Sequence, residues 1–324
     1  MDDLPQQLDF DDREAHRFVV DRAAAGTRLD KFLADHLTSF SRAALQRLIK
    51  MGLVQHNEHG AKASAKLTEG DRLLVELPTV LPDRVVPQDL PLEVLLEEPE
   101  FVVLNKAPGI AVHPGRGRPD GTIANAIAFR WGEIASSDSL ASGGHRPGIV
   151  HRLDLETSGA MVVARTERAQ EALSDAFRER RVQKEYRALV HGDPAFDEDV
   201  IDLPLGRDVH HPTIMAVRFD IGRESLTRTV VAERFGGVAA HIVCHPKTGR
   251  THQIRVHLQS RGHPLLGDSL YSRSQTDPVA VPRLMLHARR LAFPHPVSGA
   301  SVVVEAPLPV DFEQVLLLLR ELGA

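Results

Sequence analysis

The stretch GIVHRLDLETSGAMVVAR, residues 148–165, places two basic side chains and a carboxylate, His151, Arg152 and Asp154, between an apolar entry and a strand-like exit. The tripeptide TSG is a turn signal, so the segment AMVVAR after it is predicted to form a strand. An arginine within about 4 to 6 Å of an aspartate keeps the carboxylate ionised, which would make Asp154 a base or a nucleophile at neutral pH. Spacing alone favours the alternative that Arg152 and Asp154 form a structural ion pair, because such pairs are common.

The composition predicts a globular protein. The chain has 324 residues, 42% of them hydrophobic, which suits two domains. No run approaches the roughly 18 apolar residues of a membrane span, and the start MDDLPQQLDFDD is acidic where a targeting peptide would be basic or apolar. The single cysteine, Cys244, excludes an internal disulfide and a thiolate metal cage, and its apolar neighbours predict a core position. We therefore expect a cytoplasmic protein without membrane contact.

The charge is unevenly distributed. Residues 1–21 carry seven acidic side chains and two arginines, so the whole net charge of −5 lies in this segment. We expect residues 1–15 to form an acidic, disordered tail. The segment Lys247–His263, in contrast, holds four basic side chains and no acidic one. Such a local basic patch matters more for binding a polyanion than the overall charge.

Residues 16–78 are predicted to form a small N-terminal domain. Apolar spacing indicates one helix in TRLDKFLADHL, residues 27–37, and a second after the N-cap Ser41, followed by short strands. The second helix presents the basic side chains Arg42, Arg47 and Lys50 on its polar face. The segments RLDKFLA, SRAALQRLIKMGLV and LTEGDRLLVELP resemble the S4 RNA-binding domain, which implies RNA contact through that face. Without the resemblance, an ordinary solvated face is an equal alternative.

Residues 79–91, with three prolines, are predicted to be a stiff linker, or a strand laid along the domain that follows. In residues 92–324 the strand-like segments FVVLNK, AMVVAR, EYRALV, HIVC and VVVEAP alternate irregularly with the helical segments GTIANAIAFRW and ERAQEALSDAFRERR. We expect an α+β catalytic domain with a mixed, largely antiparallel sheet flanked by helices. The segment THQIRVHLQSRG fits a strand or a helix, and we favour a helix.

The sequence contains no standard cofactor motif. It lacks a dinucleotide-binding glycine loop, a Walker loop, the HExxH zinc pattern and the GxSxG elbow of serine hydrolases. His252 and His257 are five residues apart and so point to different faces of a helix or a strand. We therefore expect no cofactor and no metal.

Four segments together resemble the pseudouridine synthases of the RluA/RluC/RluD type. These are LNKAPGIAVHPG, HRLDLETSGAMVVA, KEYRALVHG and TGRTHQIRVHLQSRGHPLLGDSLY, in that order. Where the family continues GDSLY with glycine, this chain has Ser272, which puts the shape of that loop in doubt. The resemblance implies an isomerase that moves uracil from N1 to C5 attachment on ribose and needs neither redox cofactor nor metal.

The same resemblance implies roles for individual residues. Asp154 matches the catalytic aspartate, Arg152 the arginine that holds the target nucleotide out of its helix, Tyr186 the tyrosine packed on the uracil, and Arg255 the basic partner of the aspartate. Arg250, in the basic segment Lys247–His263, is a further candidate RNA contact. Two of these residues have a simpler interpretation: Tyr186 could be an ordinary aromatic residue of a strand, and Arg255 could be an exposed charged residue of a helix.

The substrate predicted from these motifs is large-subunit ribosomal RNA, and the protein is expected to act as a monomer. Transfer RNA remains an alternative substrate, and a non-catalytic RNA-binding assembly factor an alternative function. The sequence leaves open whether Asp154 attacks C1' or removes a ribose proton.

Overall fold

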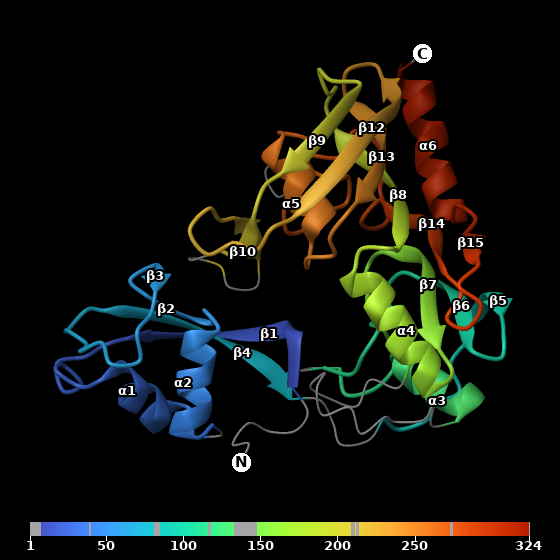
Figure 1. The fold of residues 1–324 in the computed structure, drawn as a ribbon. Helices are drawn as coiled ribbons and strands as arrows, with labels where there is room; N and C mark the ends of the chain where they lie inside the picture. The colour runs from blue at the N-terminus through green and yellow to red at the C-terminus, as the bar shows by residue number, and fades with distance from the viewer. Residues whose placement is uncertain are drawn as a thin grey trace. The chain divides into compact units, whose positions relative to one another are not determined.

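The computed structural model describes residues 8–38, 40–80, 85–115, 118–132, 148–208, 211, 214–272 and 275–323. The chain forms two compact units (Figure 1). Of the described residues, one unit contains those within 8–80 and 205–223, and the other contains those within 85–132, 148–204 and 224–323. Among the helices of the described residues, none combines the length and apolar character that crossing a membrane requires.

The first unit contains a four-stranded antiparallel sheet in the order β1-β4-β2-β3. Its strands are β1 (Leu8–Val19), β2 (Val54–His56), β3 (His59–Gly60) and β4 (Arg72–Val80). The predicted helices are confirmed as α1 (Leu29–His36) and α2 (Arg42–Lys50), and Ser41 caps α2 by accepting a hydrogen bond from the Ala44 N–H. Their apolar faces share one core with the sheet. The short strands β10 (Leu205–Arg207) and β11 (Met215–Val217) pair as a separate hairpin.

The N-terminal tail is shorter than we expected. Residues 8–15 form the first part of β1, which pairs with β4 as far as Leu8 opposite Val80, with one irregularity between Asp9 and Arg13. Net acidity predicted disorder for this segment, but a β-ladder is built from backbone groups, which charged side chains on an edge strand do not interrupt. Residues 1–7 lie outside the described residues.

The second unit is built on a nine-stranded sheet, in the order β5-β6-β7-β14-β8-β13-β12-β9, with β15 paired to β14. The strands are β5 (Glu93–Glu97), β6 (Phe101–Lys106), β7 (Ser158–Ala164), β8 (Gln183–His191), β9 (Glu198–Asp202), β12 (Leu226–Phe235), β13 (Ala239–Pro246), β14 (Leu286–Pro294) and β15 (Ser301–Glu305). The β7–β14 pair is parallel and the other pairs are antiparallel. The predicted mixed, largely antiparallel sheet is confirmed.

Helices cover both faces of this sheet. Helices α3 (Ile123–Trp131) and α5 (Gln253–Ser260) pack on the face that carries Tyr186. Helices α4 (Glu167–Arg178) and α6 (Val310–Gly323) pack on the alternate residues of the strands and so cover the opposite face. The helix expected at THQIRVHLQSRG is confirmed as α5, and Cys244 is buried in the core beneath it.

The described part of the proline-rich segment runs along α3. The Gln88 N–H donates to the Asn125 carbonyl, and Asn125 Nδ2 donates to the Val86 carbonyl. This agrees with a segment laid along the following domain. The limits placed at residues 78 and 91 stay predictions.

One row of paired residues crosses the sheet in register. Lys106 on β6 pairs with Gly159 on β7, Gly159 with Ala288 on β14, and Ala288 with Tyr186 on β8. Directly paired residues project from the same face of a sheet. Lys106 and Tyr186 therefore rise from one face with two of the smallest residues between them, and the loop containing Asp154 leads directly into β7.

Gly159 is required by this row. Its φ of +116° lies outside the range that other residues readily adopt, and a Cβ there would stand 2.3 Å from the Ala288 carbonyl oxygen. Gly159→Ala is therefore expected to lower the free energy of unfolding by more than about 2 kcal/mol.

Urea unfolding measures this loss, with Gly299→Ala as the matched control. Gly299 also has a positive φ, of +73°, but nothing lies within 4 Å of its Cβ position. The control should lose about 1 kcal/mol, the cost of the backbone conformation alone. Equal losses in the two variants would contradict the close approach of β7 and β14.

Candidate active site

The loop that carries the HRLD motif, residues 151–157, is anchored by His151. The His151 ring stacks on Phe177, with 4.5 Å between ring centroids, and its Nε2 accepts a hydrogen bond of 3.0 Å from the Val162 N–H. Burial, with a contribution from the charge of Lys184, lowers the His151 pKa to about 3, so the ring is neutral and keeps its acceptor lone pair. Leu153 is buried on the opposite side of the loop, in the core under α3. Asp154 lies between these anchors and the start of β7.

Asp154 contacts Arg255 from helix α5. Arg255 NH1 lies 3.5 Å from Asp154 Oδ2, and the Asp154 side chain keeps 22% of its surface exposed. The turn after Asp154 is closed by the Thr157 N–H, which donates to the Asp154 carbonyl. The fold thus joins two residues that are 101 positions apart in the sequence. Arg152 is exposed, and its charge adds to burial in lowering the pKa of the neighbouring His113 to about 3.

A second carboxylate, which our sequence interpretation missed, holds the other edge of Arg255. Asp268 accepts from Arg255 Nε at 2.7 Å and from Arg255 NH2 at 2.8 Å, and its side chain is fully buried. The N–H groups of Leu270 and Tyr271 also donate to Asp268 Oδ1. Burial alone would raise the Asp268 pKa, but these hydrogen bonds and the Arg255 charge lower it. The sequence signal was an aspartate in the GDSLY turn, which does not by itself indicate an arginine partner.

The GDSLY loop also positions an aromatic ring on Arg255. The Arg255 guanidinium lies 4.9 Å from the centre of the Tyr271 ring, a cation–π contact, and the Tyr271 hydroxyl is 2.9 Å from His252 Nδ1. Ser272, at the position where the resemblance implies glycine, is buried, and its hydroxyl donates to the Asp268 carbonyl at 2.6 Å. The replacement therefore contributes a hydrogen bond to the loop.

Lys106 and Tyr186 flank the loop on the sheet. Lys106 Nζ donates to the carbonyls of Ala107, Ile110 and Leu155 at 2.8 to 3.0 Å. Burial lowers the Lys106 pKa to about 8, while the charge of Asp154 opposes that shift. Burial, with the Asp154 charge, raises the pKa of Tyr186, so the phenol is neutral at neutral pH. The partly exposed carboxylate of Asp154 therefore faces Arg255, and its charge acts on both Lys106 and the neutral Tyr186 ring.

The proposed RNA-binding residues lie in two places. In the first unit, Arg42 donates to the buried carboxylate of Asp30 at 2.9 Å, Arg47 is half-buried and Lys50 is exposed. In the second unit, Arg250 lies in the turn before α5, where its Nε donates to the Glu224 carbonyl. RNA contact by these residues stays a prediction.

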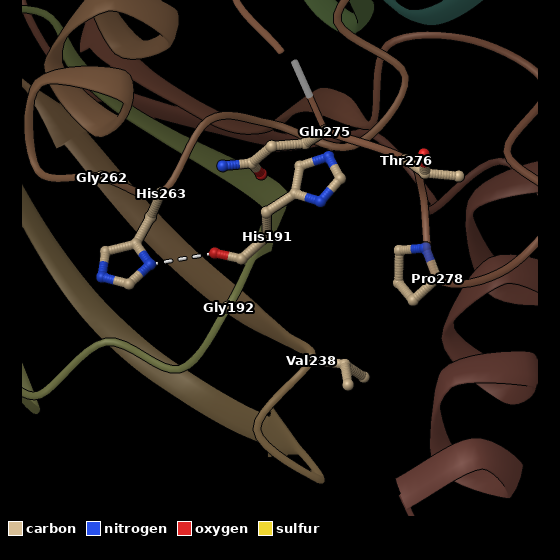
Figure 2. A pocket seen from close by; sticks show the side chains of 8 residues that line it. All are labelled: His191, Gly192, Val238, Gly262, His263, Gln275, Thr276 and Pro278. Atoms are coloured by element: carbon tan, nitrogen blue, oxygen red, sulfur yellow. Dashed lines mark hydrogen bonds between the residues drawn. The ribbon is translucent and has the colours of Figure 1, made fainter. Parts of the chain in front are cut away.

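A separate cavity of about 460 Å³ lies at the far end of β8 (Figure 2). Two histidines line it, and His263 Nδ1 donates to the His191 carbonyl at 2.9 Å. The cavity contains none of the candidate catalytic residues. Across the described residues, no group of three or more His, Cys, Asp or Glu side chains is arranged to hold a metal ion.

Comparison with known proteins decides the family. The model of the RNA pseudouridylate synthase family matches residues 100–260. A protein of Synechocystis sp. named as an RNA pseudouridine synthase is 41% identical over 327 residues, which cover 98% of each chain. This chain belongs to the RNA pseudouridine synthase family. The resemblance found in the sequence is confirmed, and the synthase is an isomerase that acts on RNA.

Another relative and a solved structure support the same family assignment. The synthase is 38% identical, over 99% of its length and 96% of the relative's, to a protein of Xanthomonas campestris pv. campestris named ribosomal large subunit pseudouridine synthase D. The solved structure of human RNA pseudouridylate synthase domain containing 1 covers 72% of the synthase at 28% identity with a TM-score of 0.54, and 96% of that chain is matched. The S4 character of the N-terminal unit stays a prediction.

The anchoring histidine makes the stability of the synthase depend on acidity. The folded-state pKa of His151 lies below its ordinary value of 6.5, so the unfolded chain takes up the proton first as the pH falls below 6.5, and stability is lost. His151→Gln retains an acceptor that cannot be protonated. Its loss of unfolding free energy between about pH 7 and pH 5 should be smaller than that of the unchanged protein by roughly 1 to 2 kcal/mol.

Urea unfolding at the two pH values gives this difference. His113 has its pKa lowered in the same direction and is present in both proteins, so its contribution cancels. Parallel pH dependence in the two proteins would show that His151 does not titrate with folding.

Proposed function

We propose that this synthase converts specific uridines of large-subunit ribosomal RNA to pseudouridine, with Asp154 as the catalytic carboxylate. The observation that carries the catalytic assignment is the Asp154–Arg255 contact, in which a partly exposed carboxylate faces an arginine that Asp268 orients from behind. The choice of substrate is supported by the relative named for the ribosomal large subunit, at 38% identity over nearly the full length of both chains.

The reaction requires the uracil to leave and rejoin its ribose. The N1–C1' bond breaks, the ring turns, and a C5–C1' bond forms; C5 then loses its proton and N1 gains one, so the product is an isomer of the substrate. Asp154 acts on the ribose, either by attacking C1' or by removing a ribose proton, and Arg255 stabilises the carboxylate. The reaction involves no electron transfer. It requires a carboxylate, a cation that stabilises it and a surface for the base, and the residues described above are of these types.

Access to the uridine requires that the base leave its stack, at a cost of a few kcal/mol. Tyr186, neutral and fixed on β8, offers the uracil a flat face beside Asp154. Arg152, exposed at the mouth of the loop, takes the space that the base leaves.

Asp154→Asn is expected to abolish turnover, because the amide neither attacks C1' nor removes a proton. Tritium release from ribosomal RNA labelled at uridine C5 measures turnover, and RNA affinity should remain within a few fold. Glu156→Gln, which removes a carboxylate from the same loop, serves as the control and should retain activity. Full activity of the Asp154 variant would refute the catalytic assignment.

Asp268 is proposed as a positioning residue that acts through Arg255. Arg255→Gln and Asp268→Asn should each lower kcat, by roughly a hundredfold for Arg255, with KM little changed. If Asp268 acts by orienting Arg255, adding Asp268→Asn to Arg255→Gln causes no further loss. Losses that multiply in the double variant would mean that Asp268 contributes independently of Arg255.

The RNA is identified by mapping pseudouridine in ribosomal and transfer RNA from cells with and without the gene. Sites lost from large-subunit ribosomal RNA are expected. Sites lost from transfer RNA alone would assign the other substrate. If no site were lost and the purified protein released no tritium from any cellular RNA, a binding factor without catalysis would be the better assignment.

A further inference from the structure

The two peptide carbonyls that follow Asp154 each accept a hydrogen bond from a cationic side chain. The Leu155 carbonyl accepts from Lys106 Nζ at 3.0 Å, and the Glu156 carbonyl accepts from Arg283 NH1 at 3.3 Å. Lys106 ends β6, whereas Arg283 lies in the irregular segment just before β14. Two separate parts of the fold therefore hold the loop 151–157 at consecutive residues.

Arg283 is itself fixed by a carboxylate at the start of helix α6. Its Nε donates to Asp311 Oδ2 at 2.6 Å and its NH2 donates to Asp311 Oδ1 at 2.9 Å, which makes a bidentate pair. The Arg283 side chain is 6% exposed, and its hydrogen bonds lower the pKa of Asp311, so the carboxylate is ionised at neutral pH. With Nε and NH2 on Asp311, NH1 is directed at the carbonyls of Leu284 and Glu156. Arg283 thus connects α6 to the loop that carries Asp154.

The backbone of Arg283 meets the other loop of the site. Gly267 packs so closely against the Arg283 carbonyl oxygen that a Cβ at position 267 would overlap it. The next residue is Asp268, the carboxylate that orients Arg255. One residue therefore contacts both the loop of Asp154, through its side chain, and the loop of Asp268, through its backbone.

We propose that Arg283, held by Asp311, is a positioning residue that sets the Asp154 carboxylate at its distance from Arg255. The inference rests on the proposed function, since it takes Asp154 as the catalytic carboxylate. The 3.5 Å contact between Asp154 and Arg255 joins a loop to helix α5, so its length depends on where the loop backbone is held. A displacement of about 1 Å at a reacting group can lower the rate by roughly 100-fold.

A lysine at position 283 separates this role from simple anchoring of α6. Lysine keeps the charge that pairs with Asp311, but it lacks the planar fork whose third nitrogen reaches the Glu156 carbonyl. If Arg283 only anchored α6, the lysine variant would retain both stability and turnover. If Arg283 positions the loop, the variant remains folded and loses turnover.

The test measures Arg283→Lys in the full-length protein, with large-subunit ribosomal RNA transcribed from uridine tritiated at C5. The kcat for tritium release should fall by roughly 10- to 100-fold, with KM within about twofold of the unchanged protein. Amide hydrogen exchange of residues 151–157, measured by mass spectrometry without RNA, should become faster because the loop has lost an anchor. Urea unfolding should show that the variant is fully folded under the assay conditions.

Two further variants complete the test. Asp311→Asn leaves Arg283 in place but removes the charge that fixes it, so it should produce the same two changes. Arg320→Lys is the matched control, because it makes the same exchange in another bidentate pair of α6, that with Glu233. The control should change neither kcat nor the exchange of residues 151–157.

An unchanged kcat in Arg283→Lys, unchanged exchange of the loop, or an equal loss in Arg320→Lys would overturn the positioning role. Asp154→Asn tests the proposed function separately. If Asp154→Asn is inactive and Arg283→Lys is fully active, the positioning role fails and the function stands. If Asp154→Asn is fully active, the catalytic assignment fails, and the positioning role fails with it.

Discussion

Arg255 contacts two carboxylates, and the geometry of the site depends on which of its N–H groups each carboxylate accepts from. Asp268 is fully buried and takes the Nε and NH2 donors at normal hydrogen-bond distances, which leaves NH1 facing Asp154 at 3.5 Å. A buried arginine with one edge fixed loses little further freedom when its other edge is used. The longer contact leaves Asp154 partly exposed, as a carboxylate that meets a substrate must be.

The sheet fixes the remaining components around this pair. The row Lys106–Gly159–Ala288–Tyr186 sets the spacing of a buried cation and an aromatic ring, and the absence of a side chain at Gly159 allows the close parallel approach of β7 and β14. Burial acts in opposite directions on the two titratable members. It lowers the pKa of Lys106 and raises that of Tyr186, and in both cases it favours the neutral form.

In the first unit, one buried carboxylate holds two arginines in place. In the small unit the buried carboxylate of Asp30 accepts from Arg28 and Arg42, and hydrogen bonds from Arg28, Gln46 and Arg42 lower the Asp30 pKa. Both arginines remain about half exposed, at 46% and 49% of the side chain, so they are held in place and still accessible.

The sequence by itself determined the family and the α+β class, located five of the six described helices and seven of the fifteen described strands, and pointed to Asp154 as the candidate catalytic residue, because these depend on local periodicity and on ordered motifs. It assigned residues 8–15 to a disordered tail, where backbone pairing with β4 instead extends a strand. Only the tertiary structure decided what surrounds Asp154. The Asp268–Arg255 pair, the Lys106–Tyr186 row and the contact of Arg283 with the Glu156 carbonyl join residues from different elements. Such contacts are set by sheet register and loop closure, and no local pattern in the chain encodes them.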